Sequence, residues 1–341
     1  AGFVSNFNLR PSMHFDAGFD HYDARFNEPE LNRPYILTRN AKGTTDAAMG
    51  WLATQDRADK RPFFIWIHYQ DPHGPYTPPK RFARPLDDYP QRKLPVLDNN
   101  YDPNGIPKYQ VIDNQRESAF YRSQYDGEVL FFDLHFGRLV AFLKEKGLYD
   151  PSVIVFTADH GESMGEHRYW FCHGQDLYSE LTSVPLIMKV PGRAPGRCET
   201  RVCHMDLYPT LMGLADPPGR KLDRFRGRDL LDPAFAAEPE RPLYSETRRE
   251  ATQDWLRSVI VGSWKLIASD KRLDEETLLF DLSSDPEEMQ NRFAAEPRIA
   301  DQMIQALDRE KAKALSGISA SEVELNPEEQ KNLEALGYTG K

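Results

Sequence analysis

Three features are scarce in this chain, and each scarcity excludes a class of protein. There are 3 cysteines in 341 residues, too few for a disulfide framework. No run approaches the roughly 18 consecutive apolar residues of a membrane span. Positive charge is scarce relative to negative charge, and the net charge is −10. This excess of negative charge argues against a nucleic-acid partner. With 40% apolar residues the chain can bury a sizeable core, and its length predicts one large domain plus a smaller one.

Apolar runs alternate with helical patterns through most of the chain. This alternation predicts a mostly parallel sheet flanked by helices, an α/β fold over residues 1–235. Short strands and one helix then predict a smaller C-terminal antiparallel sheet plus helix, an α+β subdomain over 236–341. Residues 217–242 are rich in Pro, Arg and Asp and are typical of a linker. The predicted strands are 2–6, 63–69, 152–157, 184–190, 242–247, 255–261, 263–269 and 277–282; the predicted helices are 44–57, 116–147, 206–214 and 297–314, with a last short helix from about residue 326.

One strand ends in residues that suit a metal ion. The β-branched run 153–157 is followed by Asp159, His160 and Gly161. The carboxyl edge of an open α/β sheet is where such folds bind their ligands, and an adjacent carboxylate and imidazole suit a divalent cation. The alternative is that Asp159 caps the next helix and that His160 only stands beside it.

Several segments in a fixed order carry a family resemblance. They are Phe63 to Tyr69 with Asp71-Pro72-His73-Gly74-Pro75-Tyr76, Asp159-His160-Gly161-Glu162, Gly165-Glu166-His167, Cys172-His173-Gly174, Leu177-Tyr178-Ser179-Glu180, Val184-Pro185-Leu186, Asp206 to Leu211, Leu279 to Leu282 and Leu336-Gly337-Tyr338. Taken together, they resemble the sulfatase family of the alkaline phosphatase superfamily, from residue 1 to residue 341. The resemblance implies an alkaline-phosphatase-like fold and a hydrolase that cleaves sulfate esters.

The resemblance also implies roles for single residues. Asp159 and His160 match the metal ligands of the family, which binds Ca²⁺, although an imidazole ligand also suits Mn²⁺ or Zn²⁺. His73 matches a histidine that helps to expel the leaving group; the alternative is a surface loop histidine. His173 lies about where many sulfatases carry a sulfate-binding lysine; the alternative is a histidine at a helix N-terminus.

Weaker candidates for substrate binding complete the predicted site. Asn6 lies near the position of a lysine in some family members, but the Gly-Lys-Trp-His segment that carries it is absent here. His167 and Arg168 are candidates for the pocket rim.

The family's nucleophile motif does not occur in these 341 residues. Sulfatases convert the first residue of a Cys/Ser-x-Pro-x-Arg element to formylglycine, and no cysteine or serine here fits it. We therefore expect the chain to lack an N-terminal portion that carries the nucleophile and further metal ligands, and to be inactive alone. By resemblance, the substrate is a sulfated small molecule or a sulfated glycan, and the compartment is periplasmic, extracellular or lysosomal. No signal peptide is visible, and the oligomeric state stays open.

Two other functions remain. One is a one-metal phosphodiesterase or phosphonate monoester hydrolase of the same superfamily. A two-zinc phosphatase is disfavoured, because none of the 9 histidines follows an Asp by four residues. The other is a non-catalytic relative that keeps the fold as a binding module.

Overall fold

The computed structural model describes residues 1–55, 61–100, 102–215, 226–235, 240–249, 252–271 and 277–315. These residues form two compact units. One consists of Ala1–His173 and Ser183–Gly192, and the other of Gly174–Thr182 and the described residues from Arg193 onward. The predicted division between residues 235 and 236 stays a prediction.

A parallel sheet organises the first unit, as the alternating pattern predicted. The sheet has the order β2-β1-β5, with both neighbour pairs parallel. Its strands are β1 (Gly2–Phe3), β2 (Tyr22–Asp23) and β5 (Trp66–Ile67), shorter than the apolar runs suggested. A separate pair, β6 (Ile154–Thr157) and β9 (Leu186–Lys189), is antiparallel. Periodicity identified both runs as strands, but it does not report the direction of pairing.

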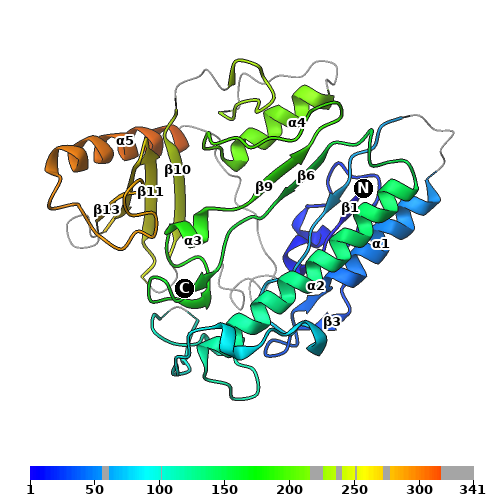
Figure 1. Ribbon diagram of the computed structural model, residues 1–341, viewed down its shortest axis with the longest axis horizontal. Helices are drawn as coiled ribbons and strands as arrows, with labels where there is room; N and C mark the ends of the chain where they lie inside the picture. Colours follow the sequence, from blue (N-terminus) through cyan, green and yellow to red (C-terminus); the bar gives the residue numbers. More distant parts are fainter. Residues whose placement is uncertain are drawn as a thin grey trace. The chain divides into compact units, whose positions relative to one another are not determined.

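Two long helices pack on each other in this unit (Figure 1). Helix α1 (Ala41–Thr54) begins three residues before its predicted start, because the Asn40 side chain caps it by accepting the Gly43 N–H at 3.0 Å. Helix α2 (Ser118–Glu145) lies within its predicted range. Arg138 on α2 is 2.9 Å from Asp46 on α1, which joins the two helices.

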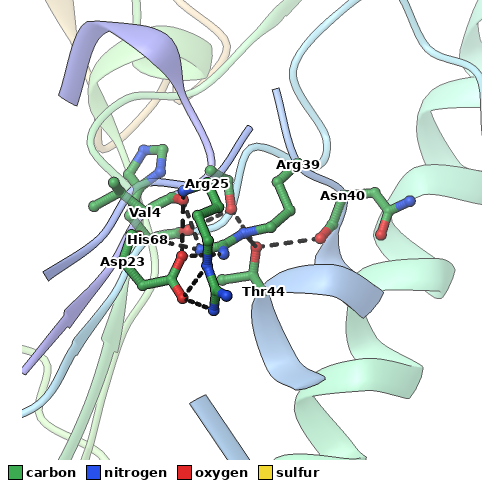
Figure 2. Close-up of polar contacts among 8 residues, drawn as sticks. Val4, Asp23, Arg25, Arg39, Asn40, Thr44 and His68 are labelled. Carbon is green, nitrogen blue, oxygen red and sulfur yellow. Dashed lines mark hydrogen bonds and ion pairs between the residues drawn. The ribbon is translucent and has the colours of Figure 1, made fainter. Parts of the chain in front are cut away.

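A buried polar network joins the carboxyl ends of the three parallel strands to α1 (Figure 2). Arg39, only 5% exposed, donates to Asp23 Oδ1 and to the Val4 carbonyl, both at 2.7 Å. Ser5 Oγ donates to the His68 carbonyl at 2.7 Å and lies 2.5 Å from Thr44 Oγ1. Hydrogen bonds therefore fix the carboxyl ends of β2, β1 and β5 to the start of α1.

The second unit contains the predicted antiparallel sheet and its helix. The sheet order is β10-β11-β12-β13, with every pair antiparallel. Helix α5 packs on it through Ala300, Met303, Ala306 and Leu307, which meet Val259, Leu266 and Leu279 in one buried cluster. The bounds are β10 (Leu243–Arg248), β11 (Trp255–Val261), β12 (Trp264–Ser269), β13 (Leu278–Asp281) and α5 (Pro297–Leu315).

The remaining elements are short, and most of them escaped sequence analysis because segments of two to four residues carry too little periodicity. Helix α4 (Leu207–Ala215) was predicted; the last helix near residue 326 and half of the linker (217–225 and 236–239) lie outside the described residues. No helix in the described part of the chain is long and apolar enough to span a membrane. The other elements are β3 (Glu28–Pro29), β4 (Leu37–Thr38), β7 (Ser163–Met164), β8 (Trp170–Cys172), α3 (Ser179–Thr182), and the 3-10 helices η1 (Phe7–Leu9), η2 (Pro11–Met13), η3 (Lys80–Phe82), η4 (Leu86–Asp88), η5 (Lys108–Gln110) and η6 (His204–Asp206).

Candidate active site

Asp159 and His160 directly follow strand β6. The Asp159 side chain is 79% exposed, and its Oδ1 accepts the His160 N–H at 3.0 Å. Asp159 Oδ2 lies 3.7 Å from His160 Nε2. The two side chains that sequence analysis assigned to a metal therefore converge at the end of this strand.

The His160 ring has a defined donor side. Its Nδ1 lies 2.7 Å from the Gly161 carbonyl oxygen. Because a carbonyl oxygen only accepts hydrogen bonds, Nδ1 carries the proton and the neutral ring keeps its lone pair on Nε2. This tautomer can bind a metal through Nε2, and a hydrogen bond at the other ring nitrogen is the usual way to fix it.

His173 follows strand β8 and lies against His160. Their ring centroids are 4.0 Å apart. His173 Nδ1 is 3.1 Å from Glu162 Oε1, and Tyr76 donates its hydroxyl to Glu162 Oε2 at 2.9 Å. Burial lowers the pKa of His173, but the Glu162 carboxylate, assisted by Asp159, outweighs burial and raises the pKa overall. His173 thus tends to hold its proton.

His73 completes a group of three imidazoles but has the opposite ionisation. Its ring centroid is 5.4 Å from that of His173, and its Nδ1 is 2.6 Å from the Gly74 carbonyl. Burial lowers the pKa of His73 well below its ordinary value, and the neighbouring charges of His173 and Arg33 lower it further. His73 is therefore neutral near pH 7, with an Nε2 lone pair.

The weaker candidates lie elsewhere in the first unit. Asn6 caps η1 by accepting the Asn8 N–H at 2.8 Å, and it donates to Gln70 Oε1 at 2.7 Å. Since the Gln70 carbonyl accepts the His73 N–H at 2.7 Å, Asn6 is linked to the loop that carries His73. Its role at the substrate stays a prediction.

His167 and Arg168 belong to the turn between β7 and β8. Arg168 is exposed and has a positive φ of 78°. Its carbonyl accepts the Asn104 N–H at 2.7 Å. The assignment of His167 and Arg168 to the pocket rim stays a prediction.

The donor atoms fit part of a metal site. Asp159 offers exposed carboxylate oxygens, and His160 offers an Nε2 lone pair. Within the described ranges, no group of three or more His, Cys, Asp or Glu side chains is arranged to hold a metal ion. A hard cation wants about six or more oxygen ligands, so this pair alone supplies only part of the coordination shell.

Sequence analysis gave no role to two residues that organise the site. Glu162 connects His173 to Tyr76, and its side chain is only 7% exposed. Both residues stand inside the segments that carried the family resemblance. The sequence signal for Glu162 was its place two residues after His160, in a segment that no helix or strand pattern explains.

Comparison with known proteins agrees with this geometry. The sequence model of the Sulfatase family matches residues 1–217. Choline-sulfatase of Rhizobium meliloti (strain 1021) is 29% identical over 263 residues, which cover 71% of this chain and 48% of that protein. Arylsulfatase K of Mus musculus is 28% identical over 312 residues, covering 82% of this chain and 54% of that protein. The chain thus spans about half the length of these relatives.

Solved structures show the same fold at low sequence identity. BT4656, solved in complex with its substrate D-glucosamine-2-N,6-O-disulfate, superposes with a TM-score of 0.65 at 19% identity, over 88% of this chain and 77% of that one. The phosphonate monoester hydrolase of Agrobacterium radiobacter gives a TM-score of 0.60 at 21% identity, over 86% and 64%. These likenesses confirm the predicted alkaline-phosphatase-like fold. The family match over residues 1–217 establishes that the chain belongs to the sulfatase family, a family of hydrolases.

Proposed function

We propose that the protein containing this chain hydrolyses a sulfate ester at the site formed by Asp159, His160, His173 and His73. The observation that carries the proposal is a pair of neighbouring imidazoles in different surroundings. The ring centroids of His173 and His73 lie 5.4 Å apart, with His173 hydrogen-bonded to Glu162 and His73 to the Gly74 carbonyl. Glu162 raises the pKa of His173, while burial lowers the pKa of His73. A cation and a proton-transfer group side by side suit the cleavage of an anionic ester.

The two histidines have different roles in this proposal. The His173 imidazolium binds the negative charge of the sulfate group, where charge accumulates during the reaction. His73 starts neutral, and a bound sulfate beside it favours its protonated form because opposite charges attract. Protonated His73 then donates to the leaving oxygen as that oxygen departs.

Asp159 and His160 would hold a divalent cation together with ligands from outside this pair. When bound, such a cation polarises the sulfate oxygens as a Lewis acid. Ca²⁺ is the proposed ion, because the family resemblance implies it and because Asp159 presents oxygen donors. The imidazole of His160 leaves Mn²⁺ and Zn²⁺ as alternatives for the metal test below.

The nucleophile belongs to the proposal as well. We place a formylglycine, made from the Cys/Ser-x-Pro-x-Arg element, outside these 341 residues, since no residue of the chain fits that motif. The substrate class is a sulfated small molecule or a sulfated glycan, which is supported by the disulfated glucosamine bound to BT4656 and by the name of choline-sulfatase. By family resemblance we propose a periplasmic, extracellular or lysosomal compartment.

Hydrolysis of model esters tests the function. A longer protein that contains this chain and the nucleophile motif would be assayed with 4-nitrophenyl sulfate and with an aryl phosphonate monoester. We expect a higher kcat/KM for the sulfate. A preference for the phosphonate would support the alternative phosphonate hydrolase, and no turnover of either ester would support a non-catalytic relative. The 341-residue chain assayed alone should show no turnover above a matched blank.

Chelation and metal replacement test the metal. Activity should disappear with a chelator and return with Ca²⁺ more fully than with Mn²⁺ or Zn²⁺. Asp159→Ala should reduce the bound metal and the activity together. The control is Asp301→Ala, which removes an exposed carboxylate of α5. Unchanged metal content in Asp159→Ala would remove Asp159 from the ligand set.

A further inference from the structure

The loop that carries His73 runs from Asp71 to Thr77, and we name these residues the His73 loop. Gly74 lets this loop approach Gln110 closely, because a Cβ at residue 74 would lie 1.9 Å from Gln110 Nε2. Gln110 is buried and donates to the Phe171 carbonyl at 2.8 Å. One side of the loop therefore rests on a fixed polar side chain.

Glu128 of helix α2 holds the loop at both of its ends. Glu128 Oε1 accepts the Thr77 N–H at 2.8 Å, and its carboxyl group is hydrogen-bonded to the carboxyl group of Asp71. Glu128 is 7% exposed. The preceding Gly127 allows this close approach, because a Cβ there would lie 2.8 Å from Pro78 Cγ.

Two carboxyl groups can share a hydrogen bond only if one of them keeps a proton. Burial raises the pKa of Asp71 to about 6, although Glu128 and the backbone N–H of Ala41 at the start of α1 lower it, so Asp71 is the more acidic of the two carboxyl groups. Asp71 Oδ2 is buried and has no hydrogen-bond partner among the described residues. Burial, together with the charge of Asp71, raises the pKa of Glu128 to about 9. Glu28, which accepts from Asn40 Nδ2 at 2.8 Å, also faces both groups and acts in the same direction.

We propose that Glu128 is a positioning residue for His73: with one proton shared with Asp71, it fastens both ends of the His73 loop to helix α2. The catalytic consequence rests on the proposed function, since it concerns the place of His73 at the ester. The loop geometry does not rest on it. Loss of the shared proton puts two negative charges at one buried position, so the fastening fails as the pH rises through the pKa of Glu128.

Glu128→Gln separates the shared proton from the shape of the side chain. A glutamine amide can still accept the Thr77 N–H and can donate to charged Asp71, and it does not titrate. We expect the kcat of the unsubstituted protein to fall between about pH 8 and pH 10, with KM changed less, and we expect Glu128→Gln to lack that fall. Glu128→Ala, which removes both contacts, should lower kcat about 10²-fold near pH 7.

Hydrogen–deuterium exchange of residues 71–77 gives a second measurement that needs no activity. Corrected for the intrinsic pH dependence, exchange should become faster between about pH 8 and pH 10 in the unsubstituted protein but not in Glu128→Gln. Glu145→Gln is the matched control, because Glu145 lies on the same helix with its side chain 70% exposed. It should behave like the unsubstituted protein in both measurements.

The outcomes distinguish the two proposals. If the exchange pattern is as expected but no sulfate ester is hydrolysed, the proposed function fails and the role of Glu128 stands. If Glu128→Gln and the unsubstituted protein show the same alkaline change in exchange, the shared proton does not hold the loop and the inference is overturned. An unchanged exchange rate in a folded Glu128→Ala variant would overturn it as well.

Discussion

Buried charge is handled differently in the antiparallel sheet and in the histidine site. In the second unit, which contains the antiparallel sheet, Lys265 Nζ lies 2.7 Å from Glu288 Oε1, and both side chains are 0% exposed. Glu288 also accepts the N–H and the hydroxyl of Ser179, at 2.7 and 3.0 Å. In the histidine site, three imidazoles neighbour one another; Glu162 is hydrogen-bonded to His173, and Asp159 lies 3.7 Å from His160 Nε2.

The difference shows how the neighbours of a buried group determine its pKa. Burial lowers the pKa of Lys265, and the adjacent Glu288 carboxylate opposes this change. At the histidine site, Glu162 raises the pKa of His173, while burial lowers the pKa of the neighbouring His73. Unequal pKa values in two neighbouring imidazoles leave their protonation open to change when an anion binds.

Removing Lys265 from its ion pair with Glu288 should have the largest effect, which is a loss of stability. Lys265→Ala leaves the Glu288 carboxylate buried without its cation, so the free energy of unfolding should fall by about 3–5 kcal/mol. Urea denaturation measures this. The control is Lys311→Ala, which breaks a pair with Asp270 that is 34% exposed on both sides and should cost less than about 1 kcal/mol. Equal losses in the two variants would contradict the contrast between the regions.

His73→Ala should have the next largest effect, on activity instead of stability. For esters with poor leaving groups we expect about a 10²-fold loss of kcat, because proton donation matters most when the departing oxygen is basic. For activated aryl sulfates the loss should be smaller. A series of aryl sulfates of graded leaving-group pKa measures the difference. An equal loss across the series would mean that His73 only binds the substrate.

Glu162→Gln should have the smallest effect, and it should widen the difference between the two regions because His173 loses the carboxylate bonded to it while Lys265 keeps Glu288. Without the carboxylate, the pKa of His173 should fall, which an NMR titration of the imidazole resonances measures. Because Glu162 raises the folded-state pKa of His173, its stabilising contribution is complete below the unfolded value of about 6.5 and is lost as the pH rises through the folded value. The stability deficit of Glu162→Gln should therefore be larger at acidic than at alkaline pH. A deficit independent of pH would assign Glu162 a purely steric role.

The sequence predicted best where many residues repeat a pattern. Strand β11 and helices α2 and α5 carry long periodic runs and were located to within a few residues. Two-residue strands such as β2 and β7 carry no period and were not found. The convergence of His160 and His173 was expected from motif order, and the structure places their rings 4.0 Å apart. The ionisation states of His73 and His173 were not predictable, because they depend on burial and on Glu162, whose contacts arise only in the folded chain.

The Arg39 network has a consequence for how the first unit assembles. The Asp23 carboxylate at the end of β2 is 4% exposed, and its Arg39 partner directly precedes the helix cap of α1. If the strands paired before α1 docked, the Asp23 charge would be buried with only Arg25, whose side chain is 82% exposed, as its cation. If α1 docked first, Arg39 would be buried without its anion. Each intermediate is costly, so we expect pairing and docking to occur together. The backbone amides of β1, β2 and the first turn of α1 should therefore exchange with solvent in a single cooperative opening.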